Sequence, residues 1–187
     1  MEPTPDELIR IADYFQLPID VLLRKDLKIA DKARLQKLKL IILDVDGTMT
    51  DGGMYFTENG DQIKKYNTKD GMAIKREVRD GMQFGIISHG HKLNMVEDRA
   101  QLLDIKNVYV GQESKTEVLG RWCVDLNIKP EEVAFVGDDI NDIEIMKAVG
   151  LSACPADAIN AVKSISDIVL SKNGGAGCVR EFLDEWL

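Results

Sequence analysis

The sequence predicts an α/β fold: a Rossmann-like, mostly parallel sheet with helices on both faces, preceded by a short helical appendage. From Lys39 onward, short apolar runs alternate with stretches of helical periodicity, which is the pattern of successive βαβ units. Three of these runs end in carboxylate or hydroxyl side chains, at the edge where open α/β sheets bind their ligands. We therefore expect a helical appendage and linker over residues 1–38 and an α/β domain over residues 39–187.

Length and composition restrict the class of protein. The chain has 187 residues, of which 44% are hydrophobic, so it can bury a core as one domain. Its apolar runs are far shorter than the ~20 residues of a membrane helix, and its N-terminus lacks the features of a signal peptide. Cys123, Cys154 and Cys178 are too widely spaced for a disulfide framework or a zinc site. We expect a cytoplasmic protein that binds no membrane and, with a net charge of -8, no nucleic acid.

Two helices are predicted ahead of the α/β domain. Thr4 is a typical N-cap residue and Glu7 completes a capping box, so the first helix begins here. A second is expected over Pro18–Leu23, and Ala30–Leu38 is a charged helical or linker stretch. The first two segments are similar to the last two helices of Cro/repressor-type helix-turn-helix domains. However, the recognition helix would lie upstream and residues 1–38 carry seven acidic and seven basic side chains, which favours a packing or oligomerisation appendage over DNA binding.

Five segments are predicted as strands, because they are short, apolar and bounded by polar or turn-forming residues. They are Leu40–Val45, Phe84–Ser88, Asn107–Val110, Val133–Gly137 and Ile168–Leu170. A helix after the second strand has its buried stripe at Leu93, Val96, Ala100 and Leu103. Val179–Trp186 is predicted as a last amphipathic helix.

Met54–Tyr66 has a different pattern, with two strand-like segments on either side of Asn59-Gly60. This dipeptide is a strong signal for a tight hairpin turn, so we expect a β-hairpin insertion and no large cap domain. A two-stranded ribbon cannot bury all of its apolar side chains, which suggests that the hairpin meets a partner.

The first predicted strand ends in Asp44 and Asp46, two carboxylates spaced one residue apart. Residues i and i+2 of an extended segment project to the same side, and Gly47 then allows a sharp turn. Paired carboxylates bind divalent cations that prefer oxygen ligands, and one of them can act as a nucleophile or an acid. Taken alone, a strand followed by an acidic turn would be the simpler interpretation.

The motifs that follow disfavour that interpretation. Ser88 ends the second predicted strand, Lys115 begins a helical stretch, and Gly-Asp-Asp-Ile-Asn-Asp at 137–142 follows another apolar strand. With Asp-Val-Asp-Gly-Thr at 44–48, these motifs resemble, in the same order, those of the haloacid dehalogenase superfamily of phosphotransferases. The resemblance covers four motifs over about 100 residues and predicts the same Rossmann-like fold.

This resemblance implies transfer through an aspartyl phosphate. Asp44 would attack phosphorus, while Asp46 would protonate the leaving oxygen and then activate the hydrolytic water. Ser88 would hydrogen-bond a phosphoryl oxygen, and Lys115 would neutralise the charge that Asp44 shares with the phosphate.

Mg2+ is the cofactor that the resemblance implies. It would be held by the carboxylates of Asp44 and Asp138 and by the main-chain carbonyl of Asp46. Asp139 and Asp142 would orient these ligands and the lysine without binding the metal themselves.

Within the superfamily, the chain is similar to small capless phosphatases that act on sugar-acid phosphates. The likeness rests on Thr50-Asp51-Gly52, the hairpin, the run 66–72 and the run 96–100. It implies a 2-keto-3-deoxy sugar-acid phosphate as substrate, and the residues leave eight and nine carbons both open. The implied substrate-binding residues are Asn67, Lys69, Asp70, Gly71, His91 and Arg99. It also implies a homotetramer built from the hairpins, with the glycine-rich segment Asn173–Gly177 folding over a neighbouring site.

The chain departs from the family pattern after the second strand, where it reads Ser88-His89-Gly90-His91 with one extra residue. Counting from the strand selects Ser88 as the phosphate-binding hydroxyl, whereas counting back from Val96 places His89 there. We choose Ser88. His91 then occupies the usual arginine position and is a weaker anion ligand.

Two classes without phosphatase activity remain as alternatives. Response-regulator receivers also combine Asp, Ser or Thr, and Lys on a parallel sheet, but they carry the acidic pair and the phospho-acceptor in a different order. A non-catalytic assembly or regulatory module is the other alternative. The intact acidic set from Asp44 to Asp142 argues against it.

Overall fold

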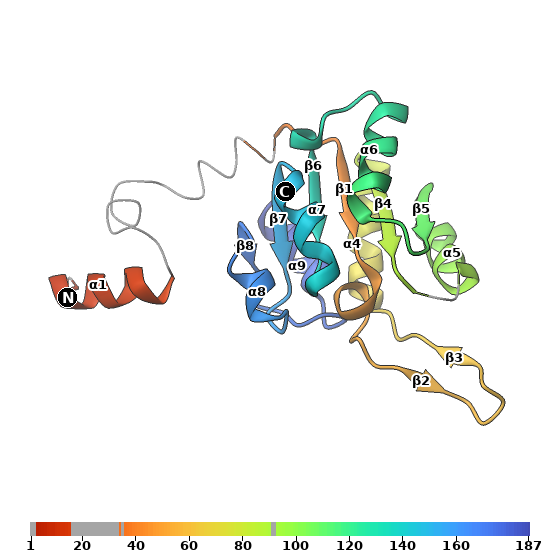
Figure 1. The fold of residues 1–187 in the computed structure, drawn as a ribbon, viewed down its shortest axis with the longest axis horizontal. Helices are drawn as coiled ribbons and strands as arrows, with labels where there is room; N and C mark the ends of the chain where they lie inside the picture. The colour runs from red at the N-terminus through yellow and green to blue at the C-terminus, as the bar shows by residue number, and fades with distance from the viewer. Residues whose placement is uncertain (1–2, 16–33, 35, 91–92) are drawn as a thin grey trace.

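A six-stranded parallel sheet forms the centre of the molecule (Figure 1). The structure is a computed structural model that describes residues 3–15, 34, 36–90 and 93–187. The strands in their spatial order are β5 (Asn107–Val110), β4 (Gln83–Ser88), β1 (Leu40–Leu43), β6 (Val133–Val136), β7 (Leu151–Cys154) and β8 (Ile168–Val169). All the pairings between them are parallel, as expected for a Rossmann-like fold.

The first strand lies in the middle of the sheet. Leu43 of β1 pairs with Ile86 of β4 on one side and with Val136 of β6 on the other. The carboxyl ends of these three strands therefore meet at one edge. Because both faces of β1 are covered, all four of its residues are fully buried, which explains its continuous apolar run.

Helices cover both faces of the sheet. Ile41 and Leu43 belong to a core formed with α4 (Thr68–Arg79), α5 (Leu93–Leu102) and α9 (Cys178–Glu185). Leu40 and Ile42 point to the opposite face and belong to a core formed with α6 (Lys115–Asp125), α7 (Ile143–Ala148) and α8 (Asn160–Lys163). Two single turns, η2 (Pro130–Glu132) and η3 (Ile140–Asp142), connect elements on this second face.

Strand β7 was not among the predicted strands. Its sequence, Leu-Ser-Ala-Cys, has no β-branched or aromatic residue, so it carries no local strand signal. It forms because it pairs with β6 on one side and β8 on the other while all four residues are buried. Tertiary packing here outweighs intrinsic propensity.

The predicted hairpin is present. β2 (Tyr55–Phe56) and β3 (Gln62–Ile63) pair in antiparallel fashion, and Gly60 adopts a φ of 84° in the connecting turn. A bridge between Thr50 and Tyr66 closes its base. Figure 1 shows the hairpin projecting away from the sheet, and the described residues contain no large cap domain.

The first helix, α1 (Pro5–Tyr14), begins as the sequence predicts. The Glu7 N–H donates to Thr4 Oγ1 at 3.4 Å and the Thr4 N–H donates to Glu7 Oε2 at 2.7 Å, which completes the capping box. The predicted helix at 18–23, most of the stretch 30–38 and residue 91 lie outside the described residues, and the division at 38/39 remains a prediction. In the part that is described, no helix is long and apolar enough to cross a bilayer.

Candidate active site

Three of the predicted site residues meet at the carboxyl edge of the sheet. Asp44 follows β1, and its N–H donates to Val136 O of β6 at 2.9 Å. Lys115, at the start of α6, is only 2% exposed. Its ammonium group donates to Asp44 Oδ1 and, at 2.5 Å, to Asp142 Oδ1. A buried lysine is thus shared between two buried carboxylates, which places a positive charge directly beside the predicted nucleophile.

The turn after Asp44 brings a further carboxylate to this group. This irregular helical turn, η1 (Val45–Met49), has Gly47 at a φ of 93°. A β-carbon on Gly47 would stand 2.1 Å from Asp138 Oδ2, so only glycine permits this approach. The Thr48 hydroxyl donates to Asp138 Oδ1 at 2.9 Å and holds the carboxylate there.

Asp142 and Asp139 have different surroundings. Asp142 is fully buried, and its second oxygen accepts from the N–H groups of Asp138 at 2.9 Å and Asp139 at 3.1 Å. The first oxygen accepts from the Lys115 ammonium group, so both oxygens of Asp142 accept hydrogen bonds that orient its neighbours. Asp139 caps the turn η3 by accepting from the Ile140 N–H at 2.7 Å. This arrangement fits the predicted supporting roles.

The carboxylates have the donor set of a divalent cation site. Oxygens of Asp44, Asp138 and Asp142 lie within 4.8 Å of one another. Both oxygens of Asp142 accept hydrogen bonds, whereas Asp44 and Asp138 each accept on Oδ1 alone among the described residues. Asp44 and Asp138 are therefore the carboxylates that fit a metal ion best. Hard oxygen ligands of this kind suit Mg2+.

The pKa values of the buried carboxyls also support a cation site. Burial raises the pKa of the Asp44 carboxyl to about 8, although Lys115 opposes the shift. Burial also raises the pKa of Asp138 to about 7, against the hydrogen bond from Thr48. For Lys115, burial alone would lower the pKa of the ammonium group, but Asp44 and Asp142 outweigh it and raise that pKa. Two buried carboxyls that resist ionisation are stabilised as anions when a cation binds between them.

Ser88 and His89 point in different directions. Ser88, at the end of β4, is buried, and its Oγ accepts from the Gly90 N–H at 3.0 Å. A β-carbon on Gly90 would lie 3.2 Å from Ser88 Oγ and 3.7 Å from Asp46 Oδ2, so hydroxyl and carboxylate are on the same side of this loop. His89 turns away: Nε2 is 2.9 Å from Glu113 O, and Nδ1 is 3.3 Å from Asn141 Nδ2.

Two of the predicted substrate residues, Asn67 and Arg99, contact each other where α4, α5 and the loop before α9 meet. Asn67 caps α4, accepting from the Lys69 N–H at 2.8 Å and donating to Gly175 O at 3.1 Å. Arg99 donates to Asn67 O at 3.1 Å and lies over the Tyr66 ring at 5.1 Å. The buried Tyr66 hydroxyl and Arg99 Nε have no hydrogen-bond partner among the described residues.

Asp70 and Gly71 are both buried, whereas residues that bind a substrate are expected to reach the pocket surface. Asp70 is buried and accepts from the Arg180 N–H at 2.7 Å, so it caps the start of α9. Burial raises its pKa. A β-carbon on Gly71 would lie 2.5 Å from Arg99 Nη2, so this glycine makes room for the arginine. Their contact with a substrate, like that of the exposed Lys69, remains a prediction.

The glycine-rich segment Asn173–Gly177 packs against its own chain. The Gly175 N–H donates to Thr48 O at 3.0 Å, and the Gly174 N–H donates to Asp157 Oδ1 at 2.9 Å. The two glycines lie too close to the turn η1 for any side chain. The expectation that this segment also covers a neighbouring site remains a prediction.

Lys64 was not among the predicted site residues. Its ammonium group forms an ion pair with Asp46 Oδ1, and its side chain is 6% exposed. The alternation of a strand places Lys64 on the same side as Tyr66, whose backbone bridges to Thr50 directly after the turn η1. That alternation was the signal available in the sequence.

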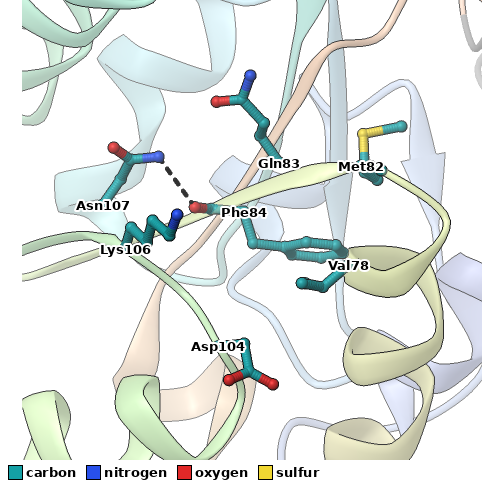
Figure 2. Close-up of a pocket in the computed structure, with 8 residues that line it drawn as sticks. Val78, Met82, Gln83, Phe84, Asp104, Lys106 and Asn107 are labelled. Carbon is teal, nitrogen blue, oxygen red and sulfur yellow. Dashed lines mark hydrogen bonds between the residues drawn. The ribbon is translucent and has the colours of Figure 1, made fainter.

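The pocket in Figure 2 lies at the opposite edge of the sheet. Its cavity of about 230 Å³ is lined by residues that include Val78, Met82, Gln83, Phe84, Asp104, Lys106 and Asn107. It contains none of the clustered carboxylates. A cavity of about 370 Å³ instead adjoins Lys115, between His89, Asn141 and Glu144.

The family follows from sequence comparison. The chain belongs to the haloacid dehalogenase-like hydrolases, because the model of that family matches residues 88–183. It is 40% identical over 152 residues to the 3-deoxy-D-manno-octulosonate 8-phosphate phosphatase of Escherichia coli K12, an alignment that covers 81% of this chain and 80% of the relative. The expected family is therefore confirmed.

Solved structures agree with the fold. The 3-deoxy-D-manno-octulosonate 8-phosphate phosphatase of Yersinia pestis superposes with a TM-score of 0.79 at 35% identity, covering 82% of each chain. The Moraxella catarrhalis enzyme, solved with magnesium, phosphate and KDO, has a TM-score of 0.79 at 27% identity and covers 82% of this chain and 88% of its own. The predicted α/β architecture is confirmed.

Proposed function

We propose that this protein is a Mg2+-dependent phosphatase that hydrolyses 3-deoxy-D-manno-octulosonate 8-phosphate to the free sugar acid and phosphate. The observation that carries the proposal is the buried contact of Lys115 with Asp44 at the carboxyl edge of the sheet, beside Asp138. Relatives that align over four fifths of the chain carry this activity in their names, and one was solved with magnesium, phosphate and KDO.

The residues supply each part of phosphoryl transfer. Asp44 attacks phosphorus while the bond to the sugar oxygen breaks, and Asp46 donates a proton to that oxygen. Asp46 then takes a proton from water, whose oxygen attacks the aspartyl phosphate and releases Asp44. Ser88 and Lys115 bind the phosphoryl oxygens throughout. Mg2+, held by Asp44, Asp138 and the Asp46 main-chain carbonyl, would supply positive charge to the same oxygens.

The sugar acid would lie beside the hairpin base. Arg99 is the cation that faces this region, and the unpartnered Tyr66 hydroxyl offers a hydrogen bond. Asn67 and Lys69, at the start of α4, would also bind the sugar acid. We propose His91 as a further, weaker ligand for its negative charge. Buried polar atoms without partners usually bind a ligand or water, which supports a polar substrate here.

A phosphate-release assay tests the activity and the substrate together. The purified chain is given the eight-carbon substrate, the nine-carbon 2-keto-3-deoxynononate 9-phosphate and unrelated sugar phosphates, each with Mg2+ or with EDTA. We expect kcat/KM to be highest for the eight-carbon ester and activity to be lost in EDTA. Preference for the nine-carbon ester would favour the sialic-acid type of phosphatase. No phosphate release from any ester would favour the non-catalytic module.

We also propose a homotetramer that forms through the hairpins. Met54, Phe56 and Ile63 are 69%, 60% and 52% exposed, whereas Tyr66 packs on the core of its own domain. Analytical ultracentrifugation of the wild type and of a variant with these three residues changed to serine tests this, with Val124→Ser on α6 as an exposed control. A wild-type monomer with full activity would contradict it.

Finally, we propose a cytoplasmic location and no nucleic-acid partner. All three cysteines are unpaired and buried, which suits a reducing compartment. The net charge of -8 disfavours a phosphate backbone as partner. Cell fractionation and an electrophoretic mobility shift with double-stranded DNA would check the two statements.

A further inference from the structure

We infer that Lys64 is a positioning residue for the acid and base Asp46, and so connects the hairpin to the chemical step. The inference rests on the proposed phosphatase activity and extends it to a residue outside the four motifs. Lys64 follows β3, eighteen residues after Asp46, and its ammonium group contacts Asp46 Oδ1.

The two partners are buried to very different extents. The Lys64 side chain is 6% exposed, whereas the Asp46 side chain is 43% exposed. Lysine is rarely buried unless it is paired, because the charged group loses its hydration. A surface ion pair would leave both groups in water, so this contact is part of the built site.

The contact leaves one carboxylate oxygen available. Lys64 binds Oδ1, while Oδ2 lies toward Ser88, within 3.7 Å of the point that a β-carbon on Gly90 would occupy. Ser88 Oγ is 3.2 Å from the same point. The lysine therefore fixes the rotation of the carboxylate so that its free oxygen faces the phosphoryl site. Misplacement of a catalytic group by about 1 Å can lower the rate by about a hundredfold.

The hairpin itself carries a matched control. Lys65 follows directly, but its side chain is 68% exposed and pairs with Asp51 at 3.1 Å, outside the catalytic group. Lys65→Met removes the same charge from the same hairpin and leaves the Asp46 contact in place. A loss that arises only from a destabilised hairpin would appear in both variants.

The test compares leaving groups. A sugar alkoxide needs a proton from Asp46, whereas p-nitrophenolate leaves without one. We expect Lys64→Met to lower kcat for the sugar phosphate about tenfold or more and to leave KM within about twofold of wild type. The rate of the pre-steady-state burst of p-nitrophenolate should also stay within about twofold, because the burst reports formation of the aspartyl phosphate, which needs no acid with this leaving group. Lys64→Arg should recover most of the loss, and Lys65→Met should match wild type.

A double-mutant cycle decides whether Lys64 acts through Asp46. If it does, Asp46→Asn with Lys64→Met is no slower than Asp46→Asn alone. Additive losses in the cycle would overturn the inference, as would a burst of p-nitrophenolate slowed as much as kcat for the sugar phosphate. A rise in KM with unchanged kcat would overturn it by making Lys64 a substrate contact. If the sugar-acid phosphate proves not to be the substrate, the cycle is run on whichever alkyl phosphate is hydrolysed.

Discussion

Gly174 packs directly on Gly47, in the turn that follows Asp44, the proposed nucleophile. A β-carbon on Gly174 would stand 1.7 Å from the Gly47 carbonyl oxygen, and one on Gly175 would stand 2.5 Å from the Asp51 nitrogen. The loop before α9 therefore packs against the backbone between Asp46 and Thr48 and holds it in place. Two segments more than 120 residues apart in the sequence form one rigid support for the site.

Gly174→Ala is expected to destabilise the protein and to impair catalysis. The clash is with main-chain atoms, which cannot move aside cheaply, so we expect a loss of about 1 to 3 kcal/mol or more in the free energy of unfolding. Urea denaturation followed by circular dichroism measures it. Gly120→Ala is the control, because Gly120 lies within α6 with open space around it, and it should raise stability by about 0.5 to 1 kcal/mol. Equal behaviour of the two variants would contradict the packing argument.

Ser88→Ala should lower kcat/KM for the sugar phosphate by about tenfold or more, because it removes the buried hydroxyl that we propose binds phosphate. His89→Ala should have a smaller effect, since its ring contacts Glu113 and Asn141 instead of the carboxylate group. Steady-state kinetics of both variants, with circular dichroism to verify folding, would compare them. Wild-type kinetics in Ser88→Ala beside a large loss in His89→Ala would assign the phosphate site to His89.

The stabilising effect of Mg2+ should grow with pH. The pKa of Asp138 is raised to about 7 and that of Asp44 to about 8, so without metal the folded protein holds protons that the unfolded chain releases. This contribution to stability is complete below about pH 4 and is lost as pH rises through 7 to 8. Metal binding displaces the same protons and is therefore stronger at higher pH.

Thermal melts with Mg2+ and with EDTA, at about pH 6 and about pH 8, check this prediction. The difference between the two melts at each pH removes the contribution of distant groups. We expect a larger difference at the higher pH, and Asp138→Asn should abolish most of it. A metal effect that is constant or shrinks with pH would be inconsistent with binding by these carboxyls.

The architecture could be predicted because its signals are local. The strand at Leu40 is apolar on both faces, the capping box at Thr4 and Glu7 is contained within four residues, and the Asn59-Gly60 turn specifies its own hairpin. In parallel sheets the carboxyl ends of neighbouring strands meet, so Asp44 and Asp138 could also be brought together from sequence alone.

Contacts between distant segments could not be predicted in this way. The burial of Lys64 against Asp46 depends on how the hairpin leaves the sheet, and the cap that Asp70 forms on α9 depends on the packing of α4 against α9. The packing of Gly174 against Gly47 depends on the path of the loop that connects β8 to α9. No spacing or composition within these segments encodes the partner.

The most direct test of the central claim is whether the phosphoryl group passes through Asp44. Asp46→Asn is incubated with p-nitrophenyl phosphate and Mg2+, because this leaving group needs no acid while loss of the base slows hydrolysis of the intermediate. After acid quenching and digestion, mass spectrometry should find one added phosphoryl group on the peptide that contains Asp44, absent when Asp44→Asn is also introduced. An unmodified peptide, together with wild-type phosphate release by Asp44→Asn alone, would contradict the assignment of Asp44 as nucleophile.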